Sequence, residues 1–193
     1  MHKLSTGVCA ECFARYLKHA FRYRDSSLVQ REVFALFHYS VEIRDLILLA
    51  KVQCNYAALE TIVNLACAHP FVRTLLDWTD VIVPMPSSFW GRIRGRYDIV
   101  AHICSKLSRT YKKELLPLRV PIYWRVSKRA MTKDIARKSE TVIQKTIFAS
   151  QADSRRYLLV DDVSSTGFTL NEAARLLNVS NHKALVIAGT EHE

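Results

Sequence analysis

Two adjacent carboxylates followed by several hydroxyls are the residues best suited to chemistry in this chain. Asp161 and Asp162 directly follow the apolar run 157–160, and the small polar segment 163–169 comes after them. Carboxylates in such a position can accept hydrogen bonds from the hydroxyls of a polyol. The backbone N–H groups of a small-residue loop and of the helix N-terminus behind it can hold a phosphate. The pattern therefore predicts a site for a ligand that combines a polyol with a phosphate, although an ordinary strand, turn and capped helix would be the structural alternative.

This stretch resembles the PRPP-binding motif of the type I phosphoribosyltransferases, whose ligand is a ribose with a 5-phosphate and a 1-pyrophosphate. The resemblance implies that Asp161 and Asp162 hold the 2- and 3-hydroxyls of the ribose and form the catalytic pair. It also implies a set that binds the ribose and the 5-phosphate, which adds Ser164, Ser165, Thr166, Gly167, Phe168 and Thr169 to the two acids. The sequence departs from the family pattern at Ser164, where an aliphatic residue is usual, and at Phe168, where a small residue is usual.

The elements that must position these residues alternate between strands and helices. Apolar runs predict strands over 32–39, 80–86, 157–160 and 184–188. Helical spacing predicts helices over 41–51, 56–68, 97–111 and from about 170 onward. This alternation predicts an α/β fold with a mostly parallel sheet flanked by helices, and the resemblance makes it a type I phosphoribosyltransferase-like fold. We expect residues 1–30 to form a short N-terminal arm and residues 31–193 to form the phosphoribosyltransferase-like domain.

A second candidate loop follows the predicted strand 80–86. It contains two small hydroxyl residues and three alternating arginines, namely Ser87, Ser88, Arg92, Arg94 and Arg96. Guanidinium groups bind phosphate oxygens in a planar fork, so this set is the candidate pyrophosphate-binding loop, acting with Mg²⁺ that accompanies PRPP. Ligands in parallel sheets bind at the C-terminal ends of strands, which predicts one site shared by this loop and the acid pair.

Within this group, the sequence resembles most specifically the ComF family of competence-associated, phosphoribosyltransferase-like proteins. This resemblance spans about residues 32 to 190. It is carried by the segment Val83–Pro86, by Trp90 with the alternating arginines, and by the segments 35–39 and 44–51. The segment 97–99 departs from the family, because it lacks the amide residues that usually follow the arginines. The resemblance to the ComF family implies a cytoplasmic role in natural transformation, in which the protein would act on incoming single-stranded DNA.

Positive charge is concentrated in one third of the chain. Between residues 86 and 145 there are fifteen lysines and arginines but four acidic residues, which accounts for the whole surplus of the chain's net charge of +10. Such a concentration favours a polyanionic ligand, either a phosphorylated small molecule or a nucleic acid, over a merely solvated basic surface. The polar segment 121–145 is predicted to be a mobile lid, and Trp90 and Trp124 could stack on bases.

The composition limits where the protein is expected to work and how its cysteines are used. There is no run of 18 apolar residues and no apolar N-terminal leader, so we expect a cytoplasmic protein without membrane insertion. Five scattered cysteines indicate buried thiols in a reducing compartment. Cys9 and Cys12 form one CxxC pair, which supplies two ligands where a structural zinc site uses four, so two ordinary thiols are expected there rather than zinc.

Three functions remain open at this stage. The first is a PRPP-binding protein of the ComF family, which could be a phosphoribosyltransferase, although no acceptor pocket or general base is evident. The second is a non-catalytic protein on the same fold that handles single-stranded DNA. The third is a transcriptional regulator that senses PRPP, for which no helix-turn-helix pattern is apparent.

Overall fold

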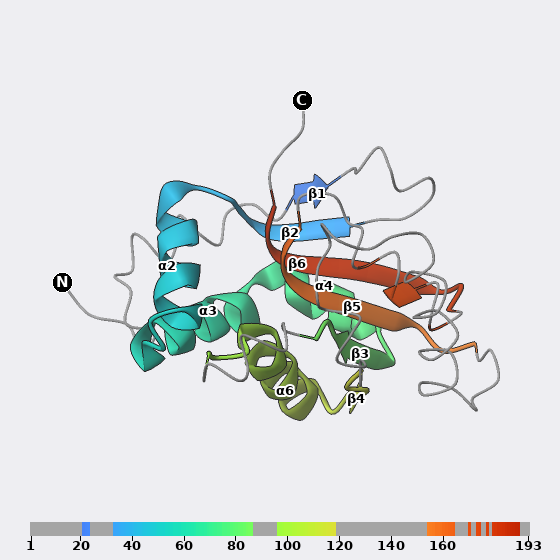
Figure 1. The fold of residues 1–193 in the computed structure, drawn as a ribbon. Coiled ribbons are helices and arrows are strands. Elements are labelled where there is room, and N and C mark those ends of the chain that lie inside the picture. The colour runs from blue at the N-terminus through green and yellow to red at the C-terminus, as the bar shows by residue number, and fades with distance from the viewer. Residues whose placement is uncertain are drawn as a thin grey trace, which may run out of the picture.

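The central feature of the fold is a six-stranded sheet with the strand order β1-β2-β6-β5-β3-β4 (Figure 1). The computed structural model describes residues 21–23, 33–86, 96–118, 154–164, 170, 173–174, 177 and 179–189. The strands are β1 (Phe21–Tyr23), β2 (Val33–His38), β3 (Val81–Pro84), β4 (Glu114–Leu115), β5 (Tyr157–Ser164) and β6 (His182–Gly189). All neighbours from β2 to β4 pair in parallel, and β1 pairs antiparallel with β2 at the edge. This confirms the predicted α/β fold with a mostly parallel sheet, which fits a type I phosphoribosyltransferase-like architecture.

The described helices begin where polar side chains cap them. They are α2 (Val41–Lys51), α3 (Tyr56–Ala68), α4 (Pro70–Trp78) and α6 (Ile99–Tyr111). The side chain of Ser40 accepts the Ile43 N–H at 3.4 Å, and that of Asp98 accepts the Ala101 N–H at 3.0 Å. These caps satisfy N–H groups that have no partner within the helix. The helices predicted over 41–51 and 56–68 match the observed bounds, and the one predicted over 97–111 begins two residues later, after its cap.

The sheet separates two core layers because successive side chains of a strand point to opposite faces. Leu158 and Val160 of β5 pack in the layer that contains the buried residues of α2, α3, α4 and α6. Tyr157 and Leu159 pack in the opposite layer, which contains the helical residues Leu170, Ala173, Ala174 and Leu177. The described apolar positions of the predicted helix after the acid pair are therefore buried on the opposite face from the four named helices.

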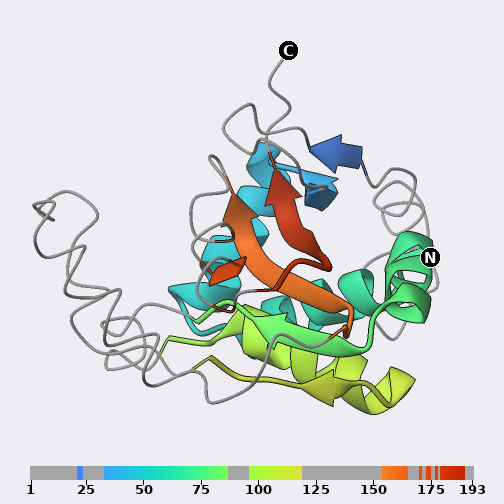
Figure 2. The ribbon, with the colours of Figure 1, turned by 90° about the vertical axis from the view of Figure 1, so that its right-hand side faces the viewer.

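The order of the strands creates a switch point between β3 and β5. After β3 the chain passes through α6 to β4, on one side of β3. After β5 it passes through the helical residues 170, 173–174 and 177 to β6, on the other side and over the other face. In open parallel sheets a ligand crevice forms outside the carboxyl ends of strands where the connections diverge in this way. The fold therefore predicts a ligand-binding site at the C-terminal ends of β3 and β5 (Figure 2).

An ion pair fixes β3 and β5 side by side at their other ends. Arg156, just before β5, donates from Nε and Nη2 to the two carboxylate oxygens of Asp80 at 3.0 and 2.8 Å, and its backbone N–H also donates to Oδ2 at 2.9 Å. The guanidinium holds the pKa of Asp80 well below its usual range. The pair sets the register in which Val81 lies opposite Tyr157 and Pro84 opposite Val160. The ion pair at the N-terminal ends of β3 and β5 therefore fixes which residues lie opposite each other at the C-terminal ends of the two strands.

Three short or closely spaced elements were missed at the sequence level. Helix α4 directly follows α3 without a loop, and its signals are Pro70 at the first position with Val72, Leu75 and Leu76 buried. That spacing and an initial proline are typical of a helix start, so α4 could have been predicted. Strands β1 and β4 have three and two residues, which is too short for a periodic pattern. Strand β1 falls within the predicted N-terminal arm, residues 1–30, whose other residues lie outside the described residues.

His69 gives the first testable prediction, because its buried ring caps α4. Its Nδ1 accepts the Phe71 N–H at 3.2 Å, the residue is 3% exposed, and burial lowers its pKa. The unfolded chain takes up a proton at the ordinary pKa and the folded chain resists it, so the stability from neutral His69 is present above pH 6.5 and is lost as the pH falls.

Replacing His69 with Asn should therefore flatten this acid-side loss of stability, since Asn keeps a capping oxygen but does not titrate. Urea unfolding at about pH 7.5 and pH 5 measures the free energy of unfolding of each protein. The change in this free energy between the two pH values is compared, because the smaller Asn side chain also leaves a cavity that lowers stability at both. The matched variant His69→Ala should lose about 1 kcal/mol more than Asn through the missing cap. Equal pH slopes for wild type and His69→Asn would refute the assigned role.

Candidate functional site

The predicted acid pair lies at the C-terminal end of the central strand. Asp161 and Asp162 are within β5, with Asp161 opposite Val186 of β6. Each carboxylate accepts the N–H of the next residue, since Asp161 Oδ1 accepts from Asp162 and Asp162 Oδ1 accepts from Val163, both at 2.8 Å. These bonds fix the two side chains against their own strand. Both residues are half-buried, so they face the edge of the sheet without being sealed inside the core.

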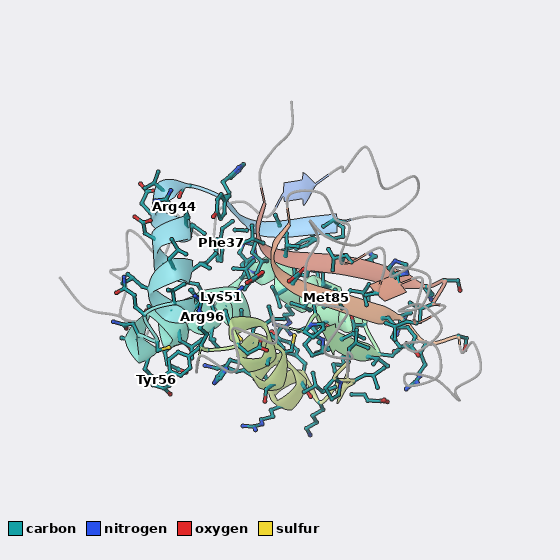
Figure 3. The ribbon with its side chains drawn as sticks, in the orientation of Figure 1. Phe37, Arg44, Lys51, Tyr56, Met85 and Arg96 are labelled. Atoms are coloured by element: carbon teal, nitrogen blue, oxygen red, sulfur yellow. The ribbon has the colours of Figure 1, made fainter. Side chains whose placement is uncertain are left out.

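Lys51, the last residue of α2, reaches the acid pair from another part of the chain. Its ammonium Nζ donates to Asp162 Oδ2 and forms an ion pair across 111 positions of sequence. Asp162 is two residues beyond Val160, which packs toward α2, so the alternation of the strand turns Asp162 to the same face. Figure 3 shows Lys51 on the side of α2 that faces the strands. The site therefore holds two carboxylates and one ammonium from two separate elements.

The ionisation of Asp161 is strongly perturbed. Burial, followed by the negative charge of Asp162, raises the pKa of Asp161 to about 7, although the Asp162 N–H and the charge of Lys51 act in the opposite direction. Ionising the Asp161 carboxyl is costly because of burial and the negative charge of Asp162, and the charge of Lys51 reduces that cost. Acidic groups with displaced pKa values are common at functional sites, because structural stability alone does not favour them.

The second predicted loop starts beside the acid pair. Pro84 at the end of β3 lies opposite Val160, and the Met85 N–H donates to the Val160 carbonyl at 2.7 Å. The loop that follows Pro86 therefore departs one step away from Asp161. At its far end, Arg96 is half-buried and stands two residues before Asp98, the N-cap of α6. The strands bring the two predicted loops to the same edge of the sheet at their starting points.

Several predicted site residues lie outside the described residues. They include the loop residues expected to bind the 5-phosphate, the remainder of the pyrophosphate set and the CxxC pair, namely Ser165, Thr166, Gly167, Phe168, Thr169, Ser87, Ser88, Arg92, Arg94, Cys9 and Cys12. The predicted lid over 121–145 and both Trp90 and Trp124 also lie outside them. Ser164 is described as the last residue of β5, in register with Gly189.

Among the cysteines in the described part of the chain, Cys67 and Cys104 are free thiols. Cys104 is buried, Cys54 and Cys67 are half-buried, and burial raises the pKa of Cys67 to about 11. A thiol with a raised pKa stays protonated at neutral pH and is a poor nucleophile. No group of three or more potential metal ligands occurs among the described residues. Within that part of the chain, the acid pair with Lys51 is therefore a stronger candidate for chemistry than the thiols.

Lys51 is the site residue that sequence reasoning did not identify as functional. It was noted at the end of the segment 44–51, as part of a resemblance, without a role. A lysine that ends an amphipathic helix usually interacts with the helix carbonyls or with solvent, and nothing in its local sequence points to Asp162. The contact joins elements 111 residues apart, so only the folded chain reveals it.

Two further findings concern the whole chain. No helix within the described ranges is long and apolar enough to cross a membrane. In comparisons with known proteins, no protein-family model and no curated protein matches this chain.

Proposed function

We propose that the chain is a PRPP-binding, phosphoribosyltransferase-like protein of the ComF family, linked to competence and DNA uptake. The observation that carries the proposal is the acid pair at the C-terminal end of β5, at the switch point of the sheet and beside Lys51. A polyol with an adjacent polyanion suits this arrangement, because carboxylates accept hydroxyl donors and an ammonium attracts phosphate oxygens. A ribose that carries phosphates combines both features.

In this proposal the described residues bind and orient the ribose. Asp161 and Asp162 accept hydrogen bonds from the 2- and 3-hydroxyls, which holds the ring at the edge of the sheet. The segment 164–169 takes the 5-phosphate, and the arginines that follow Pro86 take the pyrophosphate. If transfer occurs, pyrophosphate leaves C1 as positive charge develops on the ring, and the nearby carboxylates stabilise that charge.

Magnesium enters this scheme with the ligand. The described residues hold no cluster of three potential metal ligands, but two carboxylates are enough for an ion that keeps its waters and binds mainly to substrate phosphates. The donor set thus fits Mg²⁺ carried by PRPP rather than Mg²⁺ resident in the protein. When bound, the ion neutralises the charge of the pyrophosphate leaving group.

A thermal-shift titration tests the proposal. PRPP with Mg²⁺ should raise the melting temperature of the wild type, because a ligand that binds the folded state alone stabilises it by an amount that grows with the logarithm of its concentration over Kd. At about 100 times Kd the gain is roughly 2.7 kcal/mol. Inorganic phosphate at the same concentration serves as the control for non-specific anion binding. If PRPP raises the melting temperature no more than phosphate does, the proposed function is refuted.

A second candidate function is supported by the concentration of basic residues between 86 and 145. A strongly positive region on a phosphate-binding fold suits a single-stranded DNA partner. A labelled oligonucleotide should then bind at low salt, with an affinity that falls steeply as salt is added. Absence of binding at low salt, or binding without a salt slope, would exclude this second function.

A further inference from the structure

The Asp162 carboxylate already has a partner at each oxygen. Oδ1 accepts the Val163 N–H at 2.8 Å, and Oδ2 accepts from the ammonium of Lys51. A ribose hydroxyl that approaches Oδ2 meets that ammonium, which already occupies one of the two lone pairs of the oxygen. The ammonium also neutralises the carboxylate charge, which makes Asp162 a weaker acceptor for a neutral hydroxyl than a free carboxylate would be. The resting site is therefore partly closed to a polyol.

Lys51 is the partner that can move. Its side chain is 33% exposed, whereas that of Asp162 is 18% exposed and is held to its own strand by the Val163 N–H. Lysine carries its charge on a flexible four-carbon stem, and Lys51 is the last residue of α2. Rotation of that stem can withdraw the ammonium from Asp162 without moving the helix or the strand.

Withdrawal has a cost unless the ammonium finds another anion. Asp161 and Asp162 are adjacent in β5, and withdrawing the Lys51 ammonium removes the positive charge that is paired with Asp162. A neutral polyol carries no negative charge that could replace Asp162 as the partner of the ammonium. A ligand with an anionic group next to its hydroxyls offers a new partner within reach of the same side chain.

We propose that Lys51 is a resident counter-ion of the acid pair, which ribose hydroxyls displace, so that the site selects sugar phosphates with an anion beside those hydroxyls. The inference rests on the proposed function and deepens it, since it explains why PRPP would be preferred to ribose 5-phosphate. The two ligands share the ribose and the 5-phosphate and differ at C1, where only PRPP carries pyrophosphate. Lys51 is thus a specificity-determining residue.

Calorimetric titration of PRPP and ribose 5-phosphate, both with Mg²⁺, tests this in the wild type and in Lys51→Met. Removing the competitor should tighten ribose 5-phosphate binding by about 3-fold or more, while losing a charge-assisted contact should weaken PRPP by about 10-fold or more. The preference for PRPP should therefore fall by about 30-fold, in proportion to these two changes. Lys106→Met is the matched control, because Lys106 contacts Asn64 between α3 and α6, and its removal should leave the preference unchanged.

An unchanged preference in Lys51→Met, or an equal loss for both ligands, would overturn the inference. If Lys51→Met unfolds, Lys51→Gln provides the same comparison with a polar side chain of similar length. A ligand-free arm separates the inference from the proposed function. Without the ammonium, the pH midpoint at which the carboxyl carbon of Asp161 titrates by NMR should rise, because the Lys51 charge lowers the pKa of Asp161, and an unchanged midpoint refutes the counter-ion role. A raised midpoint in a protein that binds neither sugar phosphate would refute the proposed function and, with it, the selectivity.

Discussion

Asp161→Asn should make the ligand-free protein more stable at pH 8, by about 1–2 kcal/mol. The pKa of Asp161 in the folded protein is about 7, above the ordinary value of 3.8, so the folded state binds this proton more tightly than the unfolded state. The stability that the protonated group contributes is full below about pH 4 and is lost as the pH rises through 7. Asn stays neutral and retains the Oδ1 that accepts the Asp162 N–H, so the variant should lack this decline.

Urea unfolding from pH 4 to pH 8 measures the effect. The two stability curves should separate between pH 4 and 7 and run parallel above that range, with the variant the more stable. Asp45→Asn controls for the loss of one negative charge, because Asp45 is an exposed carboxylate on α2 that pairs with Arg44. Curves that stay parallel over the whole range, or a variant that is less stable at pH 8, would contradict the assigned environment of Asp161.

Asp161→Asn/Asp162→Asn should weaken PRPP binding by about 100-fold or more, because each hydrogen bond to a charged group contributes about 1.5–3 kcal/mol. The first substitution stabilises the free protein while the pair of substitutions removes binding, which is the trade-off expected of a functional site. Dose-dependent thermal shifts with PRPP measure the affinity in each protein.

The matched control for the double variant is Asp45→Asn/Asp77→Asn. It removes two negative charges from exposed positions on α2 and α4, while the acid pair is kept. It should bind PRPP as the wild type does. An equal loss in both double variants would mean that net charge, rather than the acid pair, governs binding.

Much of the fold could be predicted from local sequence. The helices over 41–51 and 56–68 have both an apolar face and a polar cap, at Ser40 and Asn55, so periodicity and boundary signals agree. The apolar run before Asp161 indicated a buried parallel strand, and β5 is the central strand with both faces covered. Helix α4 escaped prediction because the chain turns directly from α3 into it at His69, without the polar loop that usually separates two helices.

The candidate site could be predicted only in part, because half of its geometry depends on tertiary contacts. The sequence placed Asp161 and Asp162 at the end of a strand, which follows from local pattern alone. The contact of Lys51 with Asp162 joins positions 111 residues apart, and it depends on the order of the strands in the sheet. The raised pKa of Asp161 depends on burial and on its neighbour, and burial is a property of the folded chain.

The central claim is that the acid pair at the C-terminal end of β5 binds the ribose of PRPP. Isothermal titration of PRPP with Mg²⁺ into the wild type and into Asp161→Asn/Asp162→Asn, at about pH 8, tests it most directly. We predict saturable binding of one PRPP per chain in the wild type and no measurable binding in the variant. Absence of binding in the wild type, or equal binding in the two proteins, would contradict the account.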